Sequence, residues 1–271
     1  MKKSFIISLT LILWAGSLFS CSENKASGNE EVLEWDSIVK DTTIHLTEDI
    51  KSPTAEIHLN IKYALGKQAK TINDTILKSG ILSPDYLALE DKKLSVEEAI
   101  NLFITKYLAD YKRDFAPLYQ KDSEHTSSYN LQYSCNTTAS EDLEGVINYI
   151  ANVYNYSGGA FGMNFTVAKN ISKSSAKVLK LGDFFVSGYE EELKEIVVKE
   201  LCKKFDVKDL DELRKKNVFY GIEPYLPENF IATEDEIVFI YCDTEIAPHS
   251  VGEIRLAIEK KELQQLLKKE S

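Results

Sequence analysis

The sequence predicts an α+β fold, with antiparallel sheets that carry helices on one face and with two successive small α/β subdomains. Three observations predict it. Several segments alternate apolar and polar residues, as a half-buried strand does. Other segments place apolar residues at helical spacing. The helices are grouped between runs of strands, and consecutive strands joined by short links pair antiparallel, which favours α+β over alternating α/β architecture.

Two helices are indicated most clearly. Ser95 and Glu98 form a capping-box pattern, and an apolar stripe at helical spacing follows them. Ser187 and Glu190 repeat this start signal before a second stripe, and Gly80 is placed to end an earlier helix. The predicted helices cover residues 66–79, 95–111, 187–205 and 260–269.

The strands follow from apolar alternation and from continuous apolar runs. Residues 57–63 alternate strictly, as expected for a strand with one buried face. Residues 146–156 are rich in Val, Ile and Tyr on both parities, which predicts a central strand. The predicted strands cover residues 57–63, 129–135, 146–156, 161–167, 237–241 and 254–258.

The first 20 residues have the features of a secretory signal. Lys2 and Lys3 precede an apolar run over residues 5–19, which is short for a membrane-spanning helix of roughly 20 residues. Cys21 follows directly, so the segment resembles a bacterial lipoprotein signal, in which the cysteine is diacylated on sulfur and becomes the N-terminus. A plain signal peptide with a chance cysteine is the alternative.

These features set the expected organisation of the chain. Residues 1–20 are expected to be a lipoprotein signal peptide, and residues 21–31 a polar tether. A seam near residues 139–145 divides the rest into domains at 32–140 and 141–271, unless strands 129–135 and 146–156 pair in one sheet. We expect an extracytoplasmic lipoprotein whose Cys21 lipid anchors it to a membrane. Ser22 after the cysteine favours the outer membrane, with the protein in the periplasm or at the surface.

The charge balance excludes one class of partner. The chain has 32 Lys and Arg against 43 Asp and Glu, a net charge of −11, and removal of residues 1–20 would make it −13. Nucleic-acid binding depends on neutralising phosphates with basic residues, so we expect no nucleic-acid partner. An acidic chain attracts basic partners, although solubility alone also explains this sign.

Catalytic and metal-binding patterns are sparse. The four histidines (His45, His58, His125 and His249) are scattered, and none is spaced as a helical metal pair. Cys135, Cys202 and Cys242 lack close Cys-x-x-Cys spacing, so they form either one disulfide or buried free thiols. No nucleophile elbow or phosphate loop is present. We therefore expect no metal, no cofactor and no recognisable catalytic set.

Two segments are candidates for ligand binding. In the first, Tyr154, Tyr156 and Phe161 flank Gly158 and Gly159, so aromatics surround a turn that allows unusual dihedrals and close approach of another backbone. A hairpin turn with core aromatics is the alternative for this segment. In the second, loops provide the remaining ligand-binding candidates, which are Asn229, Glu245 and His249.

These motifs carry a resemblance. Ser157–Ala160, Leu181–Phe185, Leu226–Phe230 and Glu245–Pro248 occur in this order before Gly252. The region resembles the C-terminal extracytoplasmic domain of RsiV-type anti-sigma factors, a domain of otherwise unknown function. The part before it, residues 32–140, is similar to the domain that usually precedes it and that also stands beside the catalytic domain of PdaC-type peptidoglycan deacetylases.

The resemblance implies a binding module of the cell envelope, because this region is the lysozyme receptor in the anti-sigma relatives. Phe161 stands where relatives commonly carry His, which puts a polar contact there in doubt. The sequence shows no anti-sigma segment or deacetylase domain, so neither activity is carried over.

The leading hypothesis is therefore a non-catalytic lipoprotein that binds peptidoglycan or a lysozyme-like muramidase. Basic muramidases would be captured faster by an acidic chain. The alternative is an envelope glycan or peptidoglycan hydrolase that uses dispersed carboxylates, which sequence spacing cannot reveal. A structural assembly subunit is a third reading.

Overall fold

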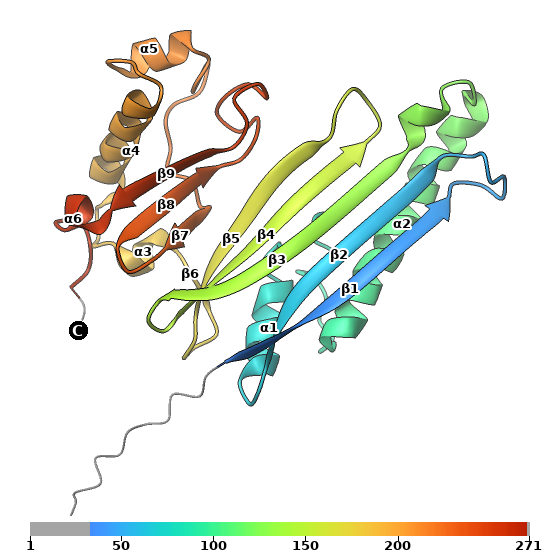
Figure 1. The fold of residues 1–271 in the computed structure, drawn as a ribbon, viewed down its shortest axis with the longest axis horizontal. Coiled ribbons are helices and arrows are strands. Elements are labelled where there is room, and N and C mark those ends of the chain that lie inside the picture. The colour runs from blue at the N-terminus through green and yellow to red at the C-terminus, as the bar shows by residue number, and fades with distance from the viewer. Residues whose placement is uncertain (1–32, 270–271) are drawn as a thin grey trace, which may run out of the picture. The chain divides into compact units, whose positions relative to one another are not determined.

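The computed structural model describes residues 33–269 (Figure 1). The expected signal peptide 1–20, the tether 21–31 and the lipidation residue Cys21 lie outside the described residues. The predicted α+β class with mainly antiparallel sheets is confirmed: residues 33–269 contain a six-stranded sheet, a three-stranded sheet and helices packed beside both. Within residues 33–269, no helix has the length and apolar character that a membrane span needs.

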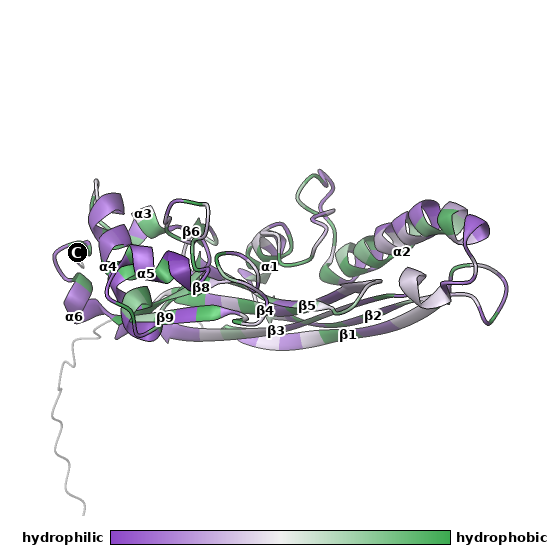
Figure 2. Cartoon of the chain, turned by 90° about the horizontal axis from the view of Figure 1, so that it is seen from above, coloured by the Kyte–Doolittle hydropathy of each residue, from purple (hydrophilic) through white to green (hydrophobic). Residues whose placement is uncertain are grey.

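The larger sheet has the strand order β1-β2-β3-β4-β5-β6. Neighbouring strands of this sheet pair antiparallel, except that β2 and β3 are parallel. A long crossover joins these two strands, as a parallel pair requires. The crossover contains α1 (Ala69–Leu77) and α2 (Val96–Lys121), and both helices lie on one face of the sheet (Figure 2). The strands are β1 (Glu34–His45), β2 (Thr54–Leu65), β3 (Leu131–Leu143), β4 (Val146–Ser157), β5 (Met163–Ser172) and β6 (Val178–Leu179).

Helix α2 starts as its sequence predicts. The Ser95 backbone N–H donates to Glu98 Oε2 at 2.7 Å, and the Glu98 N–H donates to Ser95 Oγ at 3.3 Å, which completes the capping box. The helix buries Ile100 and Phe103 against the larger sheet and runs beyond the predicted end at residue 111 to Lys121. A single 3₁₀ turn, η1 (Thr126–Tyr129), leads from it into β3.

The prediction that residues 146–156 form a central strand is confirmed, because β4 lies between β3 and β5. Its first half is buried on both faces. Tyr149 and Ala151 belong to the core under the helices, whereas Ile150 packs with Ala168 of β5 against the smaller sheet. From Asn152 onward, the side chains on the second face are polar or exposed.

The smaller sheet is antiparallel, with β8 between β7 and β9. One of its faces packs on helices around a separate hydrophobic core, and the other places Ile231, Val238 and Ile240 on the larger sheet. Its strands are β7 (Phe230–Ala232), β8 (Glu236–Tyr241) and β9 (Ile254–Glu259); the helices are α3 (Leu181–Phe184), α4 (Glu190–Lys204), α5 (Leu210–Lys215) and α6 (Lys260–Leu263).

The boundary expected between residues 140 and 141 falls inside β3. The polar residues there belong to the β3–β4 hairpin, whose register shifts between Ser140 and Leu143 and whose turn uses Gly145 at a φ of +72°. The change from one hydrophobic core to the other comes instead near residue 180, after β6. Strands 129–135 and 146–156 are therefore partners in one sheet, the arrangement that the sequence left open.

Further helix limits differ from the sequence-based expectation, and α1 begins at Ala69 instead of residue 66. Helix α4 begins at Glu190 with Tyr189 as its N-cap residue, so the start expected at Ser187 is wrong by about one turn; Gly188, at a φ of +84°, redirects the chain in between. Helix α6 ends at Leu263 instead of residue 269. The sequence did not predict β1, β6, β7, α3, α5 or the 3₁₀ turn η1.

The three cysteines in the described residues are free thiols. Cys135 lies in the core of the larger sheet, where burial raises the pKa of its thiol to about 12. Of the two alternatives drawn from the sequence, the structure contains the free thiols.

Asparagine side chains join the two sheets. Asn170 of β5 is buried; its Nδ2 donates to the Phe230 carbonyl and its Oδ1 accepts from the Ala232 N–H, both at 2.9 Å. Asn148 of β4 donates to Asn170 Oδ1 and to the Ala232 carbonyl, also at 2.9 Å. The two amides thus take the place of a neighbouring strand along the open edge of β7.

Asn170→Ala is expected to destabilise the protein by about 3 kcal/mol, because it leaves the buried Phe230 carbonyl and Ala232 N–H without partners. Urea unfolding of the purified chain measures this change. Asn164→Ala is the matched control: Asn164 lies on the same strand but is exposed, so the expected change is within about 0.5 kcal/mol. Equal effects of the two substitutions would contradict a bridging role for Asn170.

Candidate functional site

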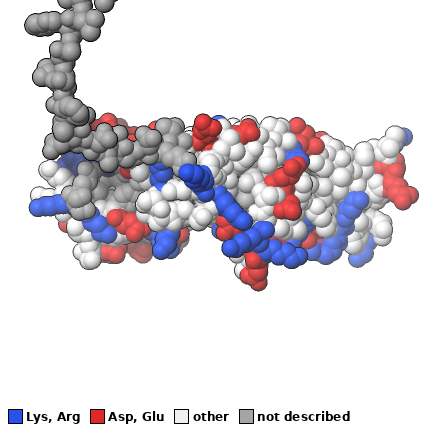
Figure 3. All heavy atoms as spheres, turned by 90° about the horizontal axis from the view of Figure 1, so that it is seen from below, with Lys and Arg blue, Asp and Glu red and all other residues white. Residues whose placement is uncertain are grey.

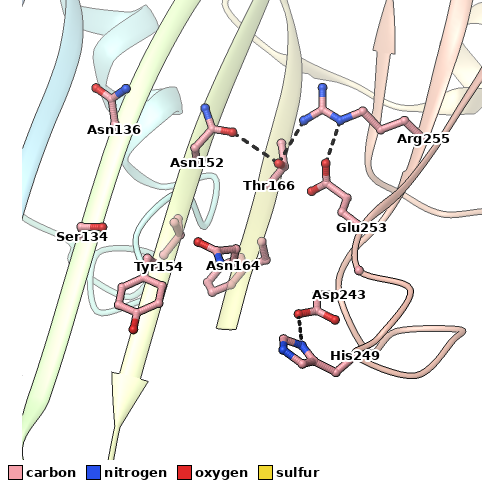
Figure 4. A pocket seen from close by; sticks show the side chains of 13 residues that line it. Ser134, Asn136, Asn152, Tyr154, Asn164, Thr166, Asp243, His249, Glu253 and Arg255 are labelled. Carbon is pink, nitrogen blue, oxygen red and sulfur yellow. Dashed lines mark hydrogen bonds and ion pairs between the residues drawn. The ribbon is translucent and has the colours of Figure 1, made fainter. Parts of the chain in front are cut away.

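A polar cleft of about 620 Å³ lies where the loop between β8 and β9 faces the larger sheet. Its floor is the sheet face opposite the helices, and Figure 4 shows the side chains that line it. The smaller sheet covers this face over Ile150 and Ala168. The next position of β4, Asn152, is exposed, and the next position of β5, Thr166, is a polar residue that is buried. The cleft therefore begins where the inward side chains change from apolar to polar.

The floor consists of amide, hydroxyl and phenol groups from three adjacent strands. In the strand register, Asn136 of β3 is paired with Asn152 of β4, which is paired with Thr166 of β5. One rung further along, Ser134, Tyr154 and Asn164 are paired in the same way. Side chains two residues apart point to the same face, so these six residues form one polar surface.

The wall of the cleft has two pairs of interacting polar side chains, Asp243 with His249 and Arg255 with Glu253. Asp243 Oδ2 is 2.6 Å from His249 Nδ1, and the Asp243 side chain is only 7% exposed. Arg255 donates from Nε to Glu253 at 2.7 Å and from a terminal nitrogen to Thr166 Oγ1 at 3.1 Å, so it ties β9 to the floor. Asp243 Oδ1 is buried without a hydrogen-bond partner among the described residues.

An aromatic contact extends from the cleft residue His249 to Phe161. The rings of Phe161 and His249 stack with their centroids 4.4 Å apart and their planes 9° apart. Phe161 comes from the turn between β4 and β5 and is 59% exposed, so much of its ring surface remains available to a ligand. The stack also links that turn to the β8–β9 loop.

Asn229 and Glu245, two of the predicted binding residues, make structural hydrogen bonds beside the cleft. Asn229 donates to the Thr166 carbonyl at 2.6 Å and accepts from the Ala168 N–H at 2.7 Å. Glu245 accepts from the Tyr225 hydroxyl at 2.8 Å and from the Cys242 N–H at 2.7 Å. Burial and the hydrogen bond to Glu245 raise the pKa of the Tyr225 hydroxyl. Neither residue lines the cleft.

The predicted glycine turn is confirmed as a site of close backbone approach. Gly158 has a φ of +70°, and a Cβ atom at this position would overlap the carbonyl oxygen of Ser128. Tyr156 donates to the Gly159 carbonyl at 3.1 Å, within the same turn. These contacts are structural, which agrees with the hairpin alternative drawn from the sequence for this part of the segment.

The structure thus brings together only part of the predicted set. Tyr154 and His249 line the cleft, and Phe161 stacks on His249. The residues that sequence reasoning missed are Ser134, Asn136, Asn152, Asn164, Thr166, Asp243, Glu253 and Arg255. The sequence contains a pattern that could have indicated some of these residues. Asparagine is depleted in strands, yet it occurs repeatedly in the predicted strands.

This chemistry suits a ligand rich in hydroxyl and amide groups. Asparagine amides and hydroxyls both donate and accept hydrogen bonds, so they match groups that do the same. Aromatic rings at Tyr154 and Phe161 add apolar faces. Among residues 33–269, no three His, Cys, Asp or Glu side chains gather as a metal site would require.

Comparison with known proteins gives the class of the C-terminal part. Residues 182–261 match the family model described as "Protein of unknown function (DUF3298)", so a DUF3298 domain covers α3 to β9. A member of the DUF3298 family from Bacteroides fragilis NCTC 9343 has a similar structure, with a TM-score of 0.76, 22% identity and coverage of 88% of this chain and 94% of that one.

Two further relatives extend the comparison. A DUF3298 family protein from Pseudomonas aeruginosa PAO1 has a TM-score of 0.59 at 18% identity, covering 88% of this chain and 95% of that one. At these identities the structures show the fold alone. The peptidoglycan-N-acetylmuramic acid deacetylase PdaC of Bacillus subtilis (strain 168) is 25% identical over 220 residues, which are 79% of this chain and 44% of that protein.

These findings confirm the expected similarity to PdaC and the expected domain of unknown function. The chain spans less than half the length of PdaC. The assignment to RsiV-type anti-sigma factors stays a prediction.

Gly158→Ala is expected to destabilise the chain by at least about 2 kcal/mol, because the new methyl group meets the Ser128 carbonyl and the positive φ disfavours alanine. Thermal and urea unfolding measure the loss. Gly182→Ala in α3 is the control: the added Cβ meets nothing within 4 Å, so stability is expected to stay within about 0.5 kcal/mol. A wild-type stability for Gly158→Ala would refute the close approach.

Proposed function

We propose that this protein is a non-catalytic module of the bacterial cell envelope that binds the glycan strands of peptidoglycan in the cleft beneath the β8–β9 loop. The observation that carries the proposal is the cleft floor, which presents Asn136, Asn152, Asn164 and Thr166 on adjacent strands. Sugar hydroxyl and acetamido groups donate and accept hydrogen bonds, as these side chains do. The aromatic faces of Tyr154 and Phe161 are suited to the apolar face of a sugar ring.

The comparisons support the choice of glycan. PdaC, by its name, acts on N-acetylmuramic acid in peptidoglycan, and this chain is similar to part of it. The lipoprotein-like N-terminus agrees with an envelope location, where peptidoglycan is the abundant polymer.

The sequence also suggests a lysozyme-like protein as the partner, and this hypothesis depends on the charge of the chain. The net charge of −11 would speed encounter with a basic protein. On the face drawn in Figure 3, however, lysines and arginines gather along one border and acidic side chains are interspersed among them. That face is therefore not uniformly acidic. We favour the glycan because the floor of the cleft is lined by neutral polar side chains.

A second candidate function is hydrolysis of the same glycan, the alternative that the sequence left open. One observation favours it: Asp243 holds His249 at 2.6 Å, as a carboxylate orients a general base, and Glu253 lies in the same cleft. The test is to incubate peptidoglycan with the full chain and to measure new reducing ends. If they are released by the wild-type chain and not by His249→Ala, the function is catalysis and not binding alone.

Asn152→Ala is expected to weaken binding of the disaccharide N-acetylglucosaminyl-N-acetylmuramic acid by about 3- to 10-fold, because it removes one amide that donates and accepts. Isothermal titration of the full-length chain in mild detergent measures this, with lysozyme titrated in parallel. Asn101→Ala, the same substitution at an exposed position of α2, is the control and should not change the affinity.

Absence of saturable disaccharide binding up to about 1 mM would overturn the glycan proposal. Tight lysozyme binding in that case would identify the protein partner as the ligand instead.

We also propose that Cys21 carries the lipid anchor. Cys21→Ser is expected to move the chain from the membrane fraction to the soluble fraction and to remove the fatty-acyl mass from its N-terminal peptide, because the lipid attaches to that sulfur. Cell fractionation and mass spectrometry measure both effects. Cys202→Ser is the control, and an unacylated N-terminus in the wild-type chain would refute the anchor.

A further inference from the structure

We infer that the bound glycan lies across the strands of the larger sheet, with one end in the cleft and the rest extending over β3 and β2 toward β1, so that several sugar rings are bound in a row. This inference rests on the proposed function and adds the length and direction of the ligand. It arises because the polar surface of the cleft floor continues well beyond the cleft.

The strand register extends both polar rungs of the floor across the sheet. Asn136 is paired with Asn60 of β2, and Ser134 is paired with His58 of β2. On β1, the partners of these two residues are Val39 and Asp41. We call the resulting surface the polar band; its two rows are Val39, Asn60, Asn136, Asn152, Thr166 and Asp41, His58, Ser134, Tyr154, Asn164.

The exposed amides of the polar band contribute little to the hydrogen bonding of the fold. Asn60, Asn136 and Asn152 are consecutive in one row, and all three are exposed. Asparagine is unfavourable in strands. The buried Asn148 and Asn170 offset this by bridging the sheets. Among the described residues, the side chains of the exposed three make one hydrogen bond, which Asn152 Oδ1 accepts from Thr166 Oγ1 at 3.4 Å. Recognition of a polar ligand explains why asparagine stands at these three positions.

The surroundings of the polar band set the direction of the ligand. Along the strands, the smaller sheet covers the face on one side at Ile150 and Ala168. Beyond β5, the band ends at the wall formed by Arg255 and the β8–β9 loop (Figure 4). Across β3 and β2 the face is open, since Asn136, Asn60 and His58 are exposed.

The dimensions of the polar band suit a chain of sugars. Neighbouring strands lie about 4.8 Å apart, so the four intervals from β5 to β1 give a length of roughly 19 Å. Paired rows make the band two side chains wide, with an amide or hydroxyl at seven of its ten positions, all on β2 to β5. At the far end, His58 Nδ1 lies 2.8 Å from Asp41 Oδ1.

The experiment compares N-acetylglucosamine oligomers of two to six rings by titration against the full-length chain. Affinity is expected to rise about 10-fold from the dimer to the longest oligomers as rings reach β2. Asn60→Ala, which lies outside the cleft, is expected to weaken the hexamer about 3- to 10-fold and to leave the dimer unchanged. Asn152→Ala is expected to weaken both, and Asn101→Ala neither.

The possible outcomes separate the two proposals. If no oligomer binds, the proposed function fails. If the dimer binds as tightly as the hexamer, or if Asn60→Ala leaves hexamer affinity unchanged, the strand-crossing arrangement is overturned while the cleft remains a glycan site. Asn60 is exposed, so its variant is expected to fold, and circular dichroism checks this.

Discussion

Hydrogen bonds from asparagine side chains hold the smaller sheet on the larger one, and the candidate site exists because of them. Asn148 and Asn170 satisfy the edge of β7, and Asn229 does the same for β5 from the other side. Because these amides are buried or half-buried, losing one leaves unpaired backbone groups inside the protein. The junction therefore has a defined register, which places the β8–β9 loop over the polar part of the floor.

The same residue type serves two purposes on one sheet face, and burial separates them. Under the smaller sheet, asparagine amides take the place of missing strand neighbours and are enclosed by apolar contacts such as Ile150 with Ala168. Two residues further along β4, Asn152 is exposed beside Tyr154. On β4, the transition between the covered and the open face coincides with the change from Ile150 to Asn152.

The sequence predicted those helices and strands that are marked by patterns within a few residues. The capping box at Ser95 starts α2, and apolar residues on both parities mark β4 as central. β1 was missed because most of its residues are only partly buried or exposed, so alternation is weak at this sheet edge. The boundary at 140–141 failed because polar residues in a hairpin resemble a linker when the pairing of β3 with β4 is unknown.

The sequence by itself determined the α+β class, most helices and strands, the glycine turn at Gly158 and three residues near the cleft, Tyr154, Phe161 and His249, since propensity, period and turn chemistry act within a few residues. Only the tertiary structure decided which of the other side chains share a site. Asn152 and Arg255 lie about a hundred positions apart in the chain, and both meet Thr166 through strand pairing and the asparagine junction. No local sequence pattern predicts this long-range pairing, because it depends on which faces of the two sheets are buried against each other.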